Sequence, residues 1–255
     1  MNVPAYHKLS PFHTVCLHQE SWMMENHVQH NEADLFETSS LLDSSALHFC
    51  ALNRDPDIGT GIKYLVKSGL SPLVQDKDGA TPLHWAARWG TVEALVALAS
   101  HISPEVPLDH FGRDPVHWFS SAGQDRYSAD LKLTFLCTQL ACSLNSRDHH
   151  LEATPLHWAA ALGGPVGILL QSAPKLVNER DRDGATPLHY LAGAVSFLEQ
   201  NLVALLRAGA DLEARTHDQH TIEQILGGNR ELSEHWDSII RNYDGDLSAN
   251  MGPGL

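Results

Sequence analysis

A ten-residue motif recurs along this chain and constrains its fold more than any other feature. Residues 78–87, Asp-Gly-Ala-Thr-Pro-Leu-His-Trp-Ala-Ala, return almost letter for letter as residues 183–192, and a third close copy occupies residues 152–160. Weaker copies lie at residues 45–49 and 114–118, and a damaged sixth copy starts at Thr221. Self-similarity of this kind predicts a stack of equivalent structural units.

The motif histidines set the period of the repeat. They are His48, His84, His117, His157 and His189, so the successive steps are 36, 33, 40 and 32 residues. The unit is about 33 residues long, and an insertion around residues 124–129 accounts for the longest step. One unit cannot bury its own apolar face, so several must stack to form a core.

The residues of the motif predict its local structure. Pro82 suits a first helical turn, where its missing N–H costs nothing, and Thr81 can cap that helix. A neutral His84 can bond the threonine and a neighbouring backbone group at once. Gly90 ends the helix, and residues 92–98 have the apolar spacing of a second helix.

The Asp-x-Asp-Gly runs at residues 76–79 and 181–184 predict tight turns. They resemble calcium loops only briefly, because an EF-hand needs a glutamate at its twelfth position. Ala87 and Ala192 stand there instead.

The motif resembles the ankyrin repeat, whose Thr-Pro-Leu-His and Ala-Ala signature is matched in full at residues 81–87 and 154–160. The resemblance covers residues 41 to 241 and implies an all-α solenoid of about six helix-turn-helix repeats with short β-turn fingers. Expected repeats are residues 41–74, 75–107, 108–146, 147–180, 181–215 and 216–243. Residues 1–40 are expected to form an N-terminal capping or docking segment, with a short helix between Phe12 and Trp22, and residues 244–255 a disordered tail.

Composition limits the class of partner. Lys and Arg number 17 against 31 Asp and Glu, and the net charge of −14 argues against nucleic acid or an anionic membrane. No stretch has the length and apolarity of a membrane span or a secretory leader. The four cysteines form no Cys-x-x-Cys pair and indicate reduced thiols, so we expect a monomeric cytoplasmic protein, with signal-independent delivery into a host cell as the alternative.

Enzyme signatures are missing from the sequence. It has no phosphate loop, no His-Glu-x-x-His and no Gly-x-Ser-x-Gly, so no catalytic residue, cofactor or metal is predicted. A small enzyme or host-directed effector remains the alternative, because nucleophile and ligand types gather near the N-terminus at His13, Cys16, His18, His27 and His30.

The family resemblance implies a function in protein–protein interaction, as an adaptor or inhibitor that binds through the concave face and the finger loops. An aromatic residue follows every motif histidine, which indicates either packing between repeats or a stripe that holds a partner. Arg88 and Trp89, with Phe111 next to them, are the strongest candidates, since Trp and Arg dominate interface energetics. The full predicted set is Arg88, Trp89, Phe111, Lys77, His110, Arg113, Trp85, Trp118, Trp158 and Arg182.

Overall fold

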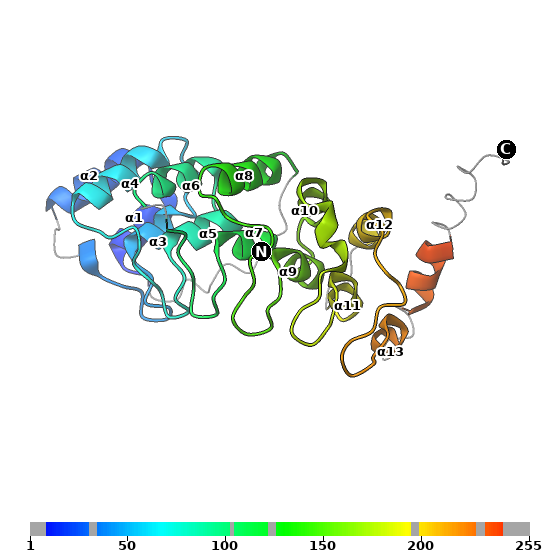
Figure 1. Ribbon diagram of the computed structural model, residues 1–255. Coiled ribbons are helices and arrows are strands. Elements are labelled where there is room, and N and C mark those ends of the chain that lie inside the picture. The colour runs from blue at the N-terminus through cyan, green and yellow to red at the C-terminus, as the bar shows by residue number, and fades with distance from the viewer. Residues whose placement is uncertain are drawn as a thin grey trace.

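The computed structural model describes residues 9–30, 35–102, 105–121, 126–194, 199–227 and 233–241. They form two rows of helices along one elongated body, and loops project side by side from the inner row (Figure 1). Among the described residues there is no β-strand, and the extended pairings are two isolated bridges, Thr38 with Ser45 and Arg215 with Thr221. The all-α solenoid that the repeat predicted is confirmed.

The inner row holds the helices that begin with the motif or a variant of it, and each packs on the next. These helices are α1 (Pro11–His18), α3 (Ala46–Cys50), α5 (Pro82–Trp89), α7 (Pro115–Ser120), α9 (Pro155–Leu162), α11 (Pro187–Ala192) and α13 (Ile222–Leu226).

The outer row holds the second helix of each unit. Its helices are α2 (Ser21–His30), α4 (Ile58–Lys67), α6 (Val92–Ala99), α8 (Arg126–Thr138), α10 (Val166–Ser172) and α12 (Glu199–Arg207). A 3-10 helix, η2 (Pro174–Asn178), follows α10, and residues 233–241 form a helix after α13. Successive outer helices from α2 to α12 pack on each other except for α8 and α10, which share only sparse contact.

The motif helices share one way of starting, which explains the motif. In α5 the backbone N–H of Thr81 donates to Nδ1 of His84 at 3.0 Å, and Pro82 fills the first turn. The helices α3, α9 and α11 begin with the same capping box. In the damaged sixth copy Gln224 replaces the histidine, and its Oε1 accepts from the N–H of Thr221 at 2.9 Å. The box therefore needs an acceptor at this position rather than a histidine.

The motif histidine also joins each unit to the next one. Its Nε2 lies within hydrogen-bonding distance of a backbone carbonyl oxygen in the following finger: Ala80 for His48 (3.0 Å), Arg113 for His84 (3.1 Å), Ala153 for His117 (3.2 Å) and Ala185 for His157 (3.1 Å). All four histidines are buried. The predicted role as hydrogen-bonding struts is confirmed for these four, whereas the buried Nε2 of the fifth motif histidine, His189, has no hydrogen-bond partner among the described residues.

The fingers are tight turns that an aspartate holds closed. Oδ1 of Asp76 accepts from the backbone N–H groups of Asp78 and Ala80 at 3.0 and 2.9 Å, and Gly79 has a left-handed φ of 78°. Oδ2 of Asp76 accepts from the indole N–H of Trp85 at 2.9 Å. The carboxylate bonds the motif's aromatic residue in the same way in three further pairs, Asp109 with Trp118, Asp148 with Trp158 and Asp181 with Tyr190.

Neighbouring fingers are linked through their backbones. One N–H near each tip donates to a carbonyl oxygen of the preceding finger at 2.7 to 3.0 Å: Lys77 to Leu42, His110 to Asp78, His149 to Phe111, Arg182 to Leu151 and His217 to Asp183. These bonds make the finger tips one continuous hydrogen-bonded edge.

The N-terminal region differs from our expectation. Two helices, α1 and α2, stand where one short helix between Phe12 and Trp22 was expected, because the chain turns at Gln19 and Glu20. Helix α1 packs on α3 and α2 on α4, so the pair continues both rows (Figure 1). Among the described residues, the paired rows therefore start at Pro11, within the segment that was expected to cap the repeats. The expected disordered tail lies outside the described residues.

A polar connection between α3 and α4 fastens this N-terminal pair. Nδ2 of Asn53 donates to two carbonyl oxygens at the end of α1, both at 2.9 Å. Oδ2 of Asp55 accepts from the backbone N–H and the hydroxyl of Ser21 at 2.8 and 2.9 Å and so caps α2 from another repeat. Burial alone would raise the pKa of Asp55, but hydrogen bonds from Asp57 and Ser21 outweigh it and lower that pKa.

Candidate partner-binding surface

Three tryptophan rings from α5 and α7 form one packed group. The centroid of the Trp89 ring lies 5.7 Å from those of Trp85 and Trp118, at interplanar angles of 85° and 89°. Edge-to-face pairs of this kind contribute about 0.5–1.5 kcal/mol each beyond the area they bury. Trp89 is only half-buried, so it brings this group to the surface.

Arg88 covers the exposed end of the group. Its guanidinium carbon lies 4.6 Å from the ring centroid of Trp89 and 5.8 Å from that of Trp118. Its Nε is buried, and no described residue accepts a hydrogen bond from it. Burial lowers the pKa of Arg88, and the nearby charge of Arg113 lowers it further.

Arg113 reaches the same place from the finger before α7. Its guanidinium carbon lies 4.9 Å from the ring centroid of Phe111, 5.4 Å from that of Trp118 and 5.6 Å from that of Trp158. Its Nε donates to Oδ2 of Asp109 at 2.7 Å. The two guanidinium groups thus lie over rings from three consecutive repeats and have the Trp118 ring as a common neighbour.

We call Arg88, Trp89, Phe111, Arg113 and Trp158 the arginine–aromatic cluster. All five belong to the predicted binding set, and the stacking of repeats brings them together across α5, α7 and α9. Phe111 is 49% exposed, and the other four are half-buried. The cluster combines cations, aromatic faces and open surface, which is the composition of binding hot spots.

Two members of the predicted set are corrected by the structure. Trp85 and Trp118 are only 2% and 7% exposed, and each donates its indole N–H to the aspartate of its own finger. A partner cannot reach these rings. For both residues, packing between repeats is the correct interpretation of the aromatic stripe.

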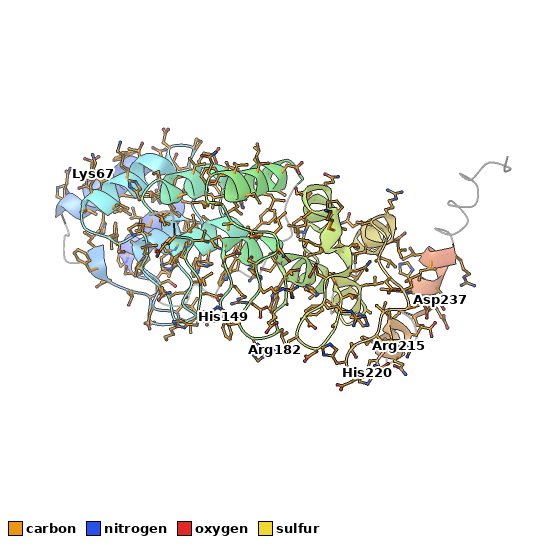
Figure 2. The ribbon with its side chains drawn as sticks, viewed as in Figure 1. Lys67, His149, Arg182, Arg215, His220 and Asp237 are labelled. Atoms are coloured by element: carbon orange, nitrogen blue, oxygen red, sulfur yellow. The ribbon has the colours of Figure 1, made fainter. Side chains whose placement is uncertain are left out.

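The remaining predicted residues lie on the fingers. Lys77 is exposed, and its Nζ donates to the carbonyl oxygen of Leu41 at 2.7 Å. The guanidinium of Arg182 donates to the carbonyl oxygen of His149 and to the carboxylate of Glu152 at 3.3 and 3.4 Å. Figure 2 shows His149 and Arg182 along the finger edge. His110 is exposed at its own finger tip, so these side chains flank the cluster rather than join its ring contacts.

His149 is a finger residue that our sequence analysis missed. Its ring packs over Gly112 as the ring of His110 packs over Gly79. The alignment of Asp148-His149 with Asp109-His110 was the available signal. The fingers of His110 and His149 therefore each present an imidazole beside the preceding finger.

Cys16, the candidate nucleophile of the N-terminal group, lies in the core of the structure. The Cys16 side chain is fully buried, and burial raises the pKa of its thiol, which is the opposite of what a nucleophile needs. His13 lies within 3.1 Å of the carbonyl oxygen of Glu37, and His27 stacks on Phe12 with ring centroids 4.9 Å apart. No group of three metal-ligand side chains occurs within the described part of the chain.

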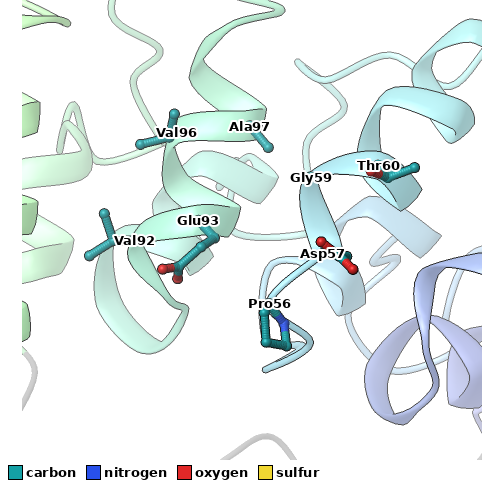
Figure 3. A pocket seen from close by; sticks show the side chains of 8 residues that line it. All are labelled: Pro56, Asp57, Gly59, Thr60, Val92, Glu93, Val96 and Ala97. Carbon is teal, nitrogen blue, oxygen red and sulfur yellow. The ribbon is translucent and has the colours of Figure 1, made fainter.

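The outer row carries a shallow hollow between α4 and α6 (Figure 3). Apolar side chains such as Val92 and Val96 line it, and the acidic side chains of Asp57 and Glu93 stand at its edge. It brings together no basic or nucleophilic group. The arginine–aromatic cluster is therefore the better candidate for a functional site.

Comparison with known proteins supports the repeat assignment. A family model described as ankyrin repeats in three copies matches residues 12–109, which includes α1 and α2. Alpha-latrotoxin-Lt1a of Latrodectus tredecimguttatus is 32% identical over 168 residues, 60% of this chain and 12% of that protein. Palmitoyltransferase AKR1 of Lachancea kluyveri is 25% identical over 232 residues, 86% of this chain and 30% of that protein. The chain thus spans less than a third of either relative.

Solved structures show the same fold. The human ASB11 ankyrin repeat domain superposes with a TM-score of 0.65 at 17% identity, covering 97% of this chain and all of that domain. A chain from the complex of the endopeptidase Bd0816 with the immunity protein Bd3460, from Bdellovibrio bacteriovorus, has a TM-score of 0.56 at 18% identity over 76% of this chain and 98% of that chain. The family model identifies ankyrin repeats in residues 12–109, and the structural comparison shows the ankyrin-repeat fold over nearly the whole chain.

Proposed function

We propose that this protein binds a partner protein through the arginine–aromatic cluster and the flanking fingers, as an adaptor or inhibitor in the cytoplasm. Ankyrin repeats generally mediate protein–protein interaction. A protein partner is also in keeping with the structural neighbour solved in an endopeptidase–immunity protein complex. The four free cysteines support a reducing compartment.

The observation that carries the proposal is the state of Arg88. Its side chain is half-buried over Trp89, yet no described side chain or carbonyl accepts from its buried Nε. A polar group that loses water without gaining a hydrogen bond destabilises the free protein. The unpaired donor of Arg88 would be satisfied if a binding partner supplied a hydrogen-bond acceptor, and this supports a role for Arg88 in binding.

The scaffold suits such binding because its surface is held in place beforehand. The histidine struts join successive repeats, and backbone hydrogen bonds join successive fingers. Little side-chain or loop ordering then has to accompany docking, so a few good contacts suffice for affinity.

We propose a monomer whose partner is neither nucleic acid nor membrane. The net charge of −14 repels both phosphate backbones and anionic lipid surfaces. Within the described residues, no helix is long and apolar enough to cross a bilayer.

The test is affinity capture from cell extract with Arg88→Met. This variant removes the charge but keeps a side chain that can pack on Trp89. A double variant of the outer row, Trp22→Ala with Lys63→Ala, is the matched control, because it removes an exposed aromatic residue and an exposed cation elsewhere. A partner should be retained by the wild type and the control and lost with Arg88→Met.

Stability distinguishes a binding role for Arg88 from a structural one. We expect the melting temperature of Arg88→Met to equal or exceed that of the wild type, since the substitution removes a half-buried charge that lacks a partner. A variant that melts earlier and also loses the partner would place Arg88 in the core and contradict the proposal.

A further inference from the structure

The charges around the cluster are unlike those of the chain as a whole. Acidic residues outnumber Lys and Arg by 31 to 17 overall, but the cluster holds two guanidinium groups, both near the Trp118 ring. Two carboxylates contact the cluster, and both are already engaged. Asp148 accepts from the Trp158 indole through Oδ2 and from the N–H groups of His150 and Leu151 through Oδ1. Asp109 is engaged as well. Its Oδ1 accepts from the N–H groups of Phe111 and Arg113, both at 2.9 Å, and its Oδ2 accepts from Arg113 Nε and from the indole of Trp118.

Arg88 therefore lies near a second cation and has no ion pair with a carboxylate among the described residues. Its open donors match the geometry of a carboxylate, which a guanidinium holds with two parallel hydrogen bonds. The surrounding aromatic faces exclude water and strengthen such an ion pair.

The setting of the cluster also limits the shape of its ligand. The motif helices α5, α7 and α9 follow one another past it, so a peptide segment can run across the inner row without ending there. The net negative charge of the rest of the chain would repel a run of several acidic residues. One carboxylate flanked by apolar side chains fits both the arginines and the rings.

We propose, on the basis of the function proposed above, that the partner segment presents a single internal Asp or Glu side chain to Arg88 and Arg113, with aromatic or aliphatic neighbours that pack on Trp89 and Phe111. The carboxylate supplies the acceptor that Arg88 lacks. The neighbours supply the apolar contact that the rings offer.

The experiment uses the full chain and a phage library of random dodecapeptides as the probe. Clones selected on the wild type should carry one acidic residue beside an aromatic or aliphatic one, and should not be enriched on Arg88→Met. A synthetic copy of one such peptide is then measured by titration calorimetry, together with its Glu→Gln or Asp→Asn form.

A double-mutant cycle isolates the ion pair. We expect about a tenfold or greater loss of affinity from Arg88→Met, a similar loss from the peptide substitution, and little further loss when the two are combined. Arg88→Lys should restore part of the affinity, because it keeps the charge without the fork of donors.

The outcomes separate this inference from the proposed function. Peptides that lose affinity on Trp89→Ala but carry no acidic residue would overturn the carboxylate ligand and leave the binding surface standing. Selection of poly-acidic clones, of free C-terminal carboxylates, or of clones equally enriched on Arg88→Met would also overturn it. If the affinity of the selected peptides is unchanged by substitution of Arg88, Trp89 or Phe111, both proposals are overturned.

Discussion

The buried histidine struts should make this protein sensitive to mild acid. Burial lowers the pKa of His48, His84 and His157 from the ordinary value of 6.5 to about 4. Each is neutral in the folded state and donates from Nε2 to the next repeat, while Nδ1 accepts the capping hydrogen bond. Protonation would place a proton on the accepting nitrogen and a charge in the core.

The sign and size of the effect follow from linkage. Between pH 6.5 and pH 4 the unfolded chain binds more protons than the folded chain, so stability is complete above this range and falls as the pH drops through it. At pH 5 each histidine loses about 2 kcal/mol relative to pH 7, and the three together lose about 6 kcal/mol. A loss of that size approaches the whole stability of many domains, about 5–15 kcal/mol.

The chain itself suggests the variant that tests this. Gln224 keeps the capping box of the sixth copy without a titrating side chain. His157→Gln should lose about 1 kcal/mol at pH 7, since the hydrogen bond to the next repeat is weakened. It should also lose about 2 kcal/mol less than the wild type between pH 7 and pH 5. The stabilities of the two proteins should therefore cross.

Urea unfolding at pH 7 and pH 5, followed by circular dichroism, measures both quantities. His220→Gln, at an exposed finger tip, controls for the glutamine substitution itself. Equal losses for His157→Gln and the wild type between the two pH values would refute the reasoning, because the acid-sensitive group would then lie elsewhere.

Three further predictions follow from single contacts. Gly184→Ala should lower stability by about 1–3 kcal/mol in urea unfolding, because φ there is 77° and a Cβ would crowd the ring of the next finger; an unchanged midpoint would show that the finger adjusts freely. Asp55→Ala should weaken the cap of α2 by about 1 kcal/mol and speed amide exchange there, whereas Asp57→Ala, whose side chain does not cap α2, should not. Under native conditions iodoacetamide should modify the half-buried Cys137 before the buried Cys16, as followed by mass spectrometry; rapid labelling of Cys16 would revive an N-terminal active site.

The sequence was sufficient for features that depend on neighbours along the chain. The Thr-Pro-Leu-His box, the second helix of each repeat and the aspartate turns all depend on residues only a few positions apart. The same local motif also marks the first unit, which contains α1 and α2. Ser10-Pro11-Phe12-His13 is a variant of the motif 35 residues before His48, and Ser10 caps α1 by accepting from the N–H of His13. We overlooked it because Ser and Phe replace Thr and Leu.

The site depended on contacts that no local pattern contains. Trp85 and Trp89 are four residues apart on one helix, yet only the neighbouring repeats decide which of them is buried. Arg88 and Arg113 are 25 positions apart, and their approach follows from how far one repeat is displaced from the next. Hot-spot composition could select these residues as candidates. It could not show that the carboxylate of Asp109 already accepts four hydrogen bonds while the Nε of Arg88 has no acceptor.

The sparse contact between α8 and α10 has a mechanical consequence. Among the described residues, the solenoid is joined at this point through α7 and α9 and through the hydrogen-bonded fingers, while α8 and α10 pack little on each other. Because the inner helices are packed and the outer helices α8 and α10 are not, the array should bend more easily by opening or closing the gap between α8 and α10 than in other directions. Thermal bending should therefore concentrate between these two repeats. Arg113 reaches across this joint to Trp158. A ligand that contacts the repeats of both α7 and α9 would therefore set the curvature of the array. The repeats after α9 would then move together as one rigid body.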